Sequence, residues 1–408
     1  MRTSSGRAMR RGSLGAAAMA LTLLGIGTTP AHAESVRDMQ WHLDAMKAEE
    51  MWKTSRGEGV IVAVIDSGVN DTIADLRGQV LPGKDFSRMS GDENNDVDDH
   101  GTSMATLIAG TGARGPQQGA FGLAPKAKIL PIRIAYNQER WHQENGVDDT
   151  FSEGMAKAIR FAADSPARVI NISVANSDEP GPELAEAVRY ALSKNKLVFA
   201  GVGNSADKGN EVGYPAATPG VVGVGGLNKD AAWWAKSQTG PQVDLAAPAE
   251  NIVKACSKGT QLCTGSGTSN STALASASAA LIWAEHPDWT NNQVLRVMLN
   301  TAGKPQGGKE RTDYIGYGAI RPRIALTDPG DPGPADVRPI PDLPAEPTAS
   351  ASPSAAPSAT TEPAPAPAPQ AAAKDGDDNT GLWIGLGVGA AVLLGAAVAV
   401  PLARARRR

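Results

Sequence analysis

A run of six apolar residues at positions 60–65, Val-Ile-Val-Ala-Val-Ile, is the feature that most restricts how this chain can fold. Similar runs rich in Val, Ile and Leu occur at 129–134, 169–174, 197–202 and 221–225. A strand that is apolar on both faces is typical of a parallel sheet covered by helices on both sides. The pattern therefore predicts a mostly parallel sheet.

Stretches with helical character separate and follow these runs. Helices are expected at 102–110, 152–163, 182–193, 271–285 and 290–301. Pro182 suits the first turn of its helix, and Thr290 suits the capping position of the last one. Strand and helix in alternation predict an α/β fold with three layers, in which the sheet lies between helices.

Residues 34–326 have the length of a single domain of ordinary size for such a sheet. A short amphipathic helix at 45–53 is expected to pack onto it. The whole chain has 408 residues, 41% of them hydrophobic, and a formal net charge of -4. This composition is typical of a globular protein and gives no indication of nucleic-acid binding.

The N-terminus has the three parts of a secretory signal peptide. Four arginines lie within the first 11 residues, an apolar stretch covers 14–26, and Ala31-His32-Ala33 offers small residues for cleavage. This arrangement predicts that residues 1–33 are removed after export. An uncleaved anchor is the alternative, although the apolar stretch is short for a membrane span.

The C-terminus has the composition of a membrane anchor. Residues 381–402 carry no charge, and as a helix they would span about 30 Å, the thickness of a hydrocarbon core. The arginine-rich residues 403–408 predict a cytoplasmic tail. Residues 327–380 include 13 prolines between Pro329 and Pro369, which predicts an extended linker. The sequence thus predicts a single-pass protein of the cell membrane with its main domain outside the cell.

The chain has two cysteines, Cys256 and Cys263. In an exported protein a close pair of this kind predicts a disulfide. The loop between them is short, so the bond is expected to fix local geometry more than to stabilise the whole fold. Two free thiols are the alternative interpretation.

Ser269 follows a glycine-containing turn, Gly265-Ser266-Gly267-Thr268, and precedes a helix of small residues. This place suits a nucleophile, because free N–H groups at a helix start stabilise an oxyanion forming beside them. A helix-capping serine without a chemical role is the alternative. The interpretation depends on whether the chain also supplies a base and an orienting acid.

His100 and Asp66 are the candidates for these two roles. His100 stands in a turn that opens a predicted helix, whereas His32 lies in the signal peptide and the other three, His42, His142 and His286, are expected to be surface side chains. Asp66 directly follows the run 60–65, and catalytic groups in open parallel sheets gather at the carboxyl ends of the strands. An aspartate that only caps the next turn is the alternative for Asp66. Asn204 follows the run 197–202 and could donate its amide to an oxyanion.

The order Asp66, His100, Ser269 is the chain order of the subtilisin class. The motifs Val64-Ile65-Asp66-Ser67-Gly68, His100-Gly101-Thr102 and Gly267-Thr268-Ser269, together with Gly203-Asn204, resemble those of subtilisin-like serine proteases. Because of its signal peptide, proline-rich linker and anchor, the chain is most similar to the mycosins. That resemblance implies an association with type VII secretion machinery.

The resemblance also implies the chemistry. Ser269 would attack a peptide carbonyl, His100 would act as the base, Asp66 would orient it, and Asn204 would stabilise the oxyanion. No cofactor would be needed. Ser173, Val174, Ala175 and Gly201 would bind the polypeptide substrate. Because Ala175 replaces a common glycine, the chain is expected to prefer small side chains at P1.

Three further interpretations stay open at this stage. Asp92, Asn94, Asp96 and Asp98 alternate as in a calcium loop, but the glycine and final glutamate of an EF-hand are missing, so no metal site is assigned. The chain could be a scaffold component of a secretion machine in which catalysis is dispensable. It could also be a cell-wall binding module.

The segment around Ser103 also resembles the serine motif of the family. Ser103 is nevertheless not the expected nucleophile, because it lies too close to His100, on the same helix start, to face it.

Overall fold

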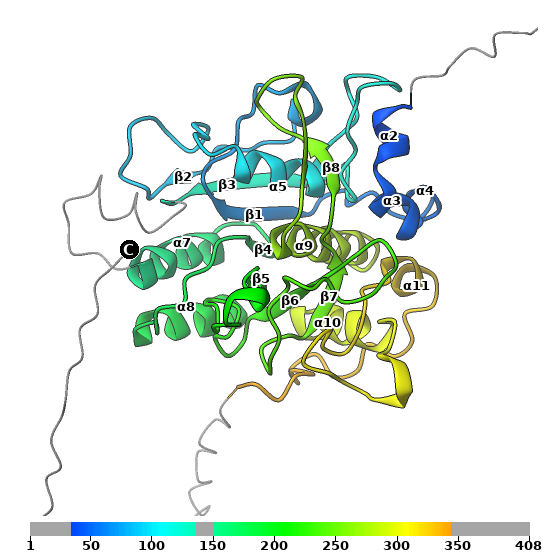
Figure 1. The fold of residues 1–408 in the computed structure, drawn as a ribbon. Coiled ribbons are helices and arrows are strands. Elements are labelled where there is room, and N and C mark those ends of the chain that lie inside the picture. Colours follow the sequence, from blue (N-terminus) through cyan, green and yellow to red (C-terminus); the bar gives the residue numbers. More distant parts are fainter. Residues whose placement is uncertain (1–33, 136–150, 344–408) are drawn as a thin grey trace, which may run out of the picture. The chain divides into compact units, whose positions relative to one another are not determined.

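The computed structural model describes residues 34–135 and 151–343. Its central feature is a parallel sheet of seven strands in the order β2-β3-β1-β4-β5-β6-β7 (Figure 1). All neighbouring strands pair in parallel, which confirms the predicted mostly parallel sheet. The strands are β1 (Ile61–Asp66), β2 (Lys84–Asp85), β3 (Lys128–Arg133), β4 (Val169–Ile172), β5 (Leu197–Gly201), β6 (Val222–Leu227) and β7 (Leu245–Pro248).

The strand order reverses at β1. β3 and β2 lie on one side of it, and β4 to β7 follow on the other. In open α/β sheets a crevice forms at the carboxyl ends of the strands where the order reverses. Asp66 is the last residue of β1, so the fold places it at this crevice.

Helices cover both faces of the sheet, as the sequence predicts. Along β1, Val62 and Val64 pack into one core with α5 and α9, and Ala63 and Ile65 pack into a second core with α7 and α8. This two-sided burial explains why the run 60–65 has no polar interruption. The helices are α2 (Val36–Met39), α3 (Trp41–Ala45), α4 (Ala48–Met51), α5 (His100–Ala109), α7 (Phe151–Asp164), α8 (Pro182–Ser193), α9 (Thr268–Glu285), α10 (Asn291–Asn300) and α11 (Pro322–Thr327). Short 3-10 turns are η1 (Ala74–Leu76), η2 (Ala206–Lys208) and η3 (Gln306–Gly308).

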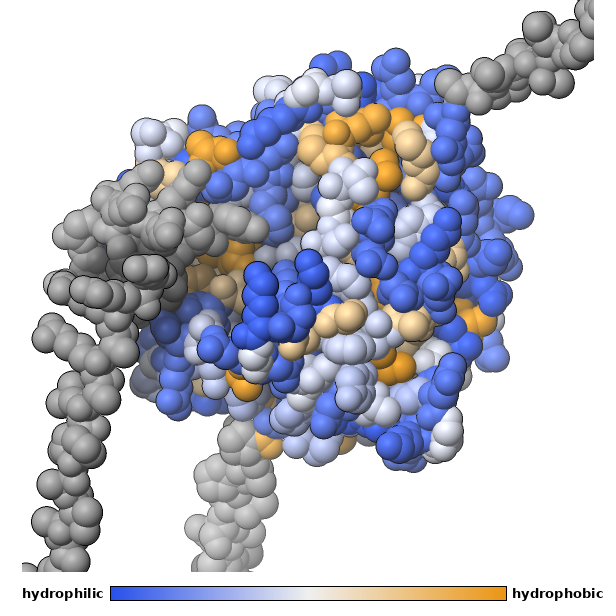
Figure 2. All heavy atoms as spheres, viewed as in Figure 1, coloured by the Kyte–Doolittle hydropathy of each residue, from blue (hydrophilic) through white to orange (hydrophobic). Residues whose placement is uncertain are grey.

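The predicted proline in the first turn of α8 and the predicted threonine cap of α10 are confirmed. Pro182 occupies the first position of α8. Thr290 caps α10 through a capping box, in which its hydroxyl accepts from the backbone N–H of Gln293 and the Gln293 side chain accepts from the N–H of Thr290. On the face drawn in Figure 2, hydrophilic side chains predominate and hydrophobic ones form small groups, since the two cores use most of the apolar residues.

The helix α9 is buried around almost its whole circumference. Its residues from Ala273 to Ala280 are small except Leu274, and they pack against the same sheet face as α5. A helix buried all round carries no polar stripe, and small side chains allow it to lie close to its neighbours. The nucleophile candidate is the second residue of this helix.

Two features differ from the sequence prediction. The helix expected at 45–53 is broken, because α3 ends at Ala45 and α4 begins at Ala48, with Lys47 between them at φ 60°. The strands β2 and β7, the antiparallel hairpin of β8 (Ile252–Ala255) and β9 (Leu262–Gly265), and the helices α2 and α11 were not predicted. These elements have six residues or fewer, too few to show a clear hydrophobic period.

The hairpin carries the predicted disulfide. Cys256 follows β8, Cys263 lies in β9, and their sulfurs are 1.94 Å apart. The free-thiol alternative is therefore excluded in this structure.

The folded body continues beyond residue 326, where the sequence placed the start of the linker. Arg296 of α10 donates to the backbone oxygens of Pro332, Pro334 and Val337, and Ile340 is buried in the core. Proline lacks an N–H but keeps its carbonyl acceptor, so a proline-rich segment can still bind a guanidinium. The linker from 344 onward lies outside the described residues.

Several predictions concern residues that the structure does not describe. The signal peptide 1–33, the anchor 381–402 and the tail 403–408 are among them. Within 34–135 and 151–343, no helix combines the length and apolar character needed to cross a bilayer. The predicted single-pass anchor is not part of those ranges.

Candidate active site

Asp66 ends β1 with its side chain fully buried. Its Oδ1 accepts from the backbone N–H of Ser67 at 2.8 Å and from the Ser67 hydroxyl at 3.2 Å. A buried carboxylate requires such donors, because an unpaired charge away from water is costly. The carboxylate is therefore held in one orientation at the carboxyl edge of the sheet.

His100 begins α5 and contacts this carboxylate. Its Nδ1 lies 2.8 Å from Asp66 Oδ1 and 3.0 Å from Oδ2. The imidazole is one-fifth exposed, whereas the carboxylate is inaccessible. With Nδ1 donating to the carboxylate, Nε2 of a neutral ring is an acceptor. The structure thus brings together two residues that the sequence selected as acid and base.

Asp96 fixes the start of the helix that carries His100. Its Oδ1 accepts from the Ser67 hydroxyl at 2.7 Å and from the backbone N–H of Asp99 at 2.8 Å. Its Oδ2 accepts from the backbone N–H and the hydroxyl of Thr102 at 2.8 and 2.6 Å. Burial raises the pKa of Asp96, while the hydrogen bonds from Thr102 and Ser67 oppose this shift.

The role of Asp96 was missed in the sequence, where it was weighed only as part of a calcium loop. The available signal was its position, four residues before His100 in the turn that leads into the helix. Its carboxylate oxygens are used by four protein donors.

Ser269 lies one residue inside the start of α9, whose N-cap is Gly267. Its hydroxyl donates to the backbone oxygen of Ser173 at 3.2 Å. Ser173 directly follows the neighbouring strand β4, so the nucleophile candidate stands at the same edge of the sheet as Asp66. By contrast, the Ser103 hydroxyl is buried and donates to the backbone oxygen of Asp99 at 2.8 Å, which agrees with its rejection as a nucleophile.

Asn204 is oriented by the turn before α9. Its Oδ1 accepts from the backbone N–H of Thr268 at 2.8 Å and from the Thr268 hydroxyl at 3.1 Å. The carbonyl end of the amide is thereby used, and the NH₂ end is left to donate. Asn204 lines a cavity that Ser269 also lines.

This cavity has a volume of about 410 Å³ and contains every residue that the sequence assigned to substrate binding. Gln238 was missed in the sequence. Its side chain is buried, its Nε2 donates to the Ser205 hydroxyl at 2.7 Å, and its Oε1 lies against Gly203, which has a positive φ of 109°. The residues that line the cavity are Ser173, Val174, Ala175, Asn176, Ser177, Gly201, Gly203, Asn204, Ser205, Glu211, Gly213, Gln238, Thr268 and Ser269.

One group of possible metal ligands occurs within the two described ranges. The carboxylate of Asp99 and the sulfurs of Cys256 and Cys263 lie within 4.8 Å of one another. The sulfurs are bonded to each other, so neither is a thiolate and the group is not a metal centre in this state.

The geometry can be compared with known proteins. The profile of the subtilase family (Peptidase S8) matches residues 57–318, more than half of the chain. The chain belongs to the subtilase family. The matched region contains Asp66, His100, Asn204 and Ser269.

Among the relatives of this subtilase are the mycosins. Mycosin-1 of Mycobacterium tuberculosis is 33% identical over 360 residues, which cover 76% of this chain and 79% of that protein. The crystal structure of MycP1 from Mycobacterium smegmatis matches with a TM-score of 0.63 at 29% identity, over 76% of this chain and 89% of that one. The MycP3 protease from the type VII (ESX-3) secretion system matches with a TM-score of 0.61 at 31% identity, over 73% and 90%. The protein is therefore a subtilisin-like serine protease similar to mycosins.

Proposed function

We propose that the protein is a membrane-anchored extracellular endopeptidase that hydrolyses polypeptides through Asp66, His100 and Ser269. The observation that carries the proposal is the 2.8 Å contact between Asp66 and Nδ1 of His100. This contact selects the tautomer in which Nε2 can accept a proton. It lies at the sheet edge where Ser269 begins a helix in a chain of the subtilase family.

In the proposed reaction His100 Nε2 takes the proton of Ser269 Oγ as that oxygen attacks the scissile carbonyl. Asp66 stabilises the imidazolium that forms. The Asn204 amide and the Ser269 backbone N–H donate to the tetrahedral oxyanion. His100 then gives the proton to the leaving amine, and water releases the acyl group by the same route. The proposal requires the Ser269 hydroxyl to turn from Ser173 to His100.

We further propose that the cavity beside Ser269 receives the P1 side chain. Ser173, Val174, Ala175 and Gly201 would form its walls, and the methyl group of Ala175 would limit its width. The proposed consequence is a preference for small side chains at P1. A peptide library that showed a strong preference for Phe or Tyr at P1 would contradict this assignment.

We also propose that the catalytic domain lies outside the cell, where residues 381–402 anchor it to the membrane after residues 1–33 are removed. Its function would be linked to type VII secretion. The apolar C-terminal segment and the similarity to a protease from the type VII (ESX-3) secretion system support it. Alkaline extraction tests the anchor. The full chain should stay in the membrane pellet, whereas a chain that ends at residue 380 should not.

The activity is tested with a fluorophosphonate probe on the full chain in membranes. We expect the parent to be labelled and the Ser269→Ala variant not to be, because the probe reacts only with an activated serine. An unlabelled but folded parent would overturn the proposal. Secretion by cells that carry Ser269→Ala separates the enzyme from the scaffold alternative, since a scaffold would still support export.

A further inference from the structure

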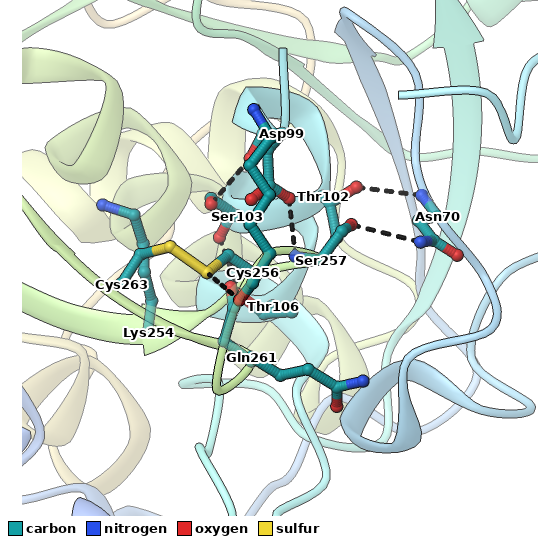
Figure 3. The surroundings of a disulfide bond; sticks show 12 residues. Asn70, Asp99, Thr102, Ser103, Thr106, Lys254, Cys256, Ser257, Gln261 and Cys263 are labelled. Atoms are coloured by element: carbon teal, nitrogen blue, oxygen red, sulfur yellow. Dashed lines mark hydrogen bonds between the residues drawn. A yellow bond between two sulfur atoms is a disulfide. The ribbon is translucent and has the colours of Figure 1, made fainter. Parts of the chain in front are cut away.

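The disulfide hairpin β8–β9 contacts the beginnings of both helices that carry the proposed reacting groups. Figure 3 shows its surroundings, with Asp99, Thr102 and Ser103 of the His100 helix start on one side and Lys254 on the other. Neither contact involves a group that takes part in the proposed chemistry. The first joins residues 158 positions apart, and the second joins residues 16 positions apart.

The first contact reaches the residue before His100. The backbone N–H of Ser257, next to Cys256, donates to Asp99 Oδ1 at 2.6 Å. Asp99 is buried and has a left-handed backbone (φ 65°), a conformation that non-glycine residues seldom adopt without support. Further along α5, the hydroxyl of Thr106 lies 2.8 Å from the backbone oxygen of Ala255 and 2.9 Å from that of Ser103, so these two oxygens share its proton. The hairpin thus holds α5 at two points.

The second contact reaches the residue after Ser269. Lys254 in β8 donates from its Nζ to Asn270 Oδ1 at 2.8 Å. The Nδ2 of Asn270 donates to the backbone oxygens of Ala249 at 3.0 Å and Gly265 at 3.1 Å. Asn270 therefore ties the first turn of α9 to the hairpin and to the loop after β7.

Burying the Lys254 ammonium costs hydration free energy, which indicates that this side chain has a specific role. It is 7% exposed, and burial lowers its pKa to about 8, while the nearby Asp99 carboxylate opposes that shift. A buried ammonium is retained only where its partners compensate for lost hydration. Because Lys254 donates to Asn270, the lysine and the amide form one polar unit.

We infer that the β8–β9 hairpin is a brace that sets the separation of His100 and Ser269, with Lys254 as a positioning residue that acts through Asn270. The inference rests on the proposed function and adds to it a group outside the reacting set. Proton transfer between the two side chains depends steeply on their distance, and a displacement near 1 Å can lower a rate by about a hundredfold.

The Lys254→Met variant of the full chain tests the brace, because methionine keeps most of the length and removes the donor. We expect kcat to fall about tenfold or more and KM to change less than about twofold, since the reacting groups move while the cavity stays intact. Lys196→Met is the matched control. Lys196 is also buried and donates one bond, at 2.8 Å to the backbone oxygen of Ser165, far from both helix starts in the chain. Its kcat should equal that of the parent.

A double-mutant cycle with Asn270→Leu distinguishes positioning from general destabilisation. If Lys254 acts through Asn270, the double variant should lose about as much kcat as either single variant. Effects on kcat that multiply, or a Lys254→Met variant as fast as the parent, would overturn the brace. An inactive parent would instead overturn the proposed function, so the two failures are distinguishable.

Dithiothreitol treatment of the parent keeps the inference testable if Lys254→Met does not fold. The reagent would reduce the Cys256–Cys263 bond to two thiols and would itself become a cyclic disulfide. No other cysteine exists in the chain to react. We expect the rate of fluorophosphonate labelling to fall severalfold and to recover after reoxidation. An unchanged rate in the fully reduced, folded protein would contradict the brace.

Discussion

The two halves of the proposed site are held by different kinds of interaction. Around His100, the carboxylates of Asp66 and Asp96 accept a set of hydrogen bonds of 2.6 to 3.2 Å. Around Ser269, the partners are neutral, namely a backbone oxygen of Ser173 and the amide of Asn204 on Thr268. Carboxylates therefore hold the acid–base half directly, whereas the nucleophile half is held by amides and backbone groups and, one residue after Ser269, by the Lys254 ammonium on Asn270. Substitutions that remove a charge should be the most damaging.

The largest effect is expected from Asp66→Asn in the acid–base half. Its amide can donate to His100 and so favour the wrong tautomer, and it cannot stabilise an imidazolium. We expect kcat to fall by about 10⁴, the loss known for the equivalent change in a serine protease of another fold. Hydrolysis of a peptide substrate measures it. A loss smaller than tenfold would show that Asp66 does not orient the base.

A smaller effect is expected from Asn204 in the nucleophile half. Asn204→Ala should lower kcat by about 10²–10³ with little change in KM, the range found for the corresponding donor in subtilisin. Asn204→Asp sharpens the test, because it keeps an acceptor for Thr268 and loses the NH₂ donor. If Asn204→Asp cleaves as fast as the parent, the amide does not stabilise the oxyanion.

Asp96→Asn tests whether charge fixes the helix start of the acid–base half. The amide can replace only part of the four hydrogen bonds, so we expect the free energy of unfolding to fall by about 2 kcal/mol and kcat by about tenfold. Urea unfolding and peptide hydrolysis measure the two effects. Asp92→Asn, at an exposed residue of the same loop, is the control and should change neither.

An effect on stability and not on kcat is expected from pH at His42, a histidine that the sequence placed at the surface. His42 is fully buried, neither ring nitrogen has a hydrogen-bond partner among the described residues, and burial lowers its pKa to about 3. Below about pH 6.5 the unfolded chain binds a proton there that the folded chain does not bind, so stability falls as pH decreases, by up to about 1.4 kcal/mol per unit. His42→Leu should reduce this slope in urea unfolding between pH 6.5 and 4.5.

Asp244 makes the free energy of unfolding change with pH in the opposite direction. The contributions of Asp244 and His42 can therefore be measured separately. Burial raises the pKa of Asp244 to about 7, so the folded chain holds a proton there that the unfolded chain releases above about pH 4. Its contribution to stability is lost as pH rises toward 7. Asp244→Asn should therefore make the fall in stability below pH 6.5 steeper, and a shallower fall would contradict the assignment.

The sequence predicted the sheet and the residues at its carboxyl edge well. The run 60–65 and the residues after it have short-range signals, namely β-branched residues, a strand end and a helix start. Asp66, His100 and Asn204 could therefore be selected from local patterns. The strand end predicts the place of Asp66 at the crevice, and the contact of His100 with Asp66 brings these two residues together.

The hairpin and the Asp96 network could not be predicted in the same way. Ser257 and Asp99 are 158 positions apart, and nothing in either segment marks the other as its partner. Lys254 resembles an ordinary strand residue until the fold buries it. The cavity residue Gln238 is a further example, because its backbone N–H donates to the backbone oxygen of Gly203 and its Nε2 to the Ser205 hydroxyl, both of which come from a different loop.

The packing of residues 329–343 on the domain has a mechanical consequence. A pull on the chain at its C-terminal side meets the Arg338–Asp342 ion pair and the Asp342 contact with Gly220 before it reaches the sheet. The three backbone oxygens that Arg296 binds lie further along the same segment and would be loaded one after another. Tension from the C-terminal side would thus have to break these bonds before it is passed along the chain to α10 and α9, the helix that carries Ser269.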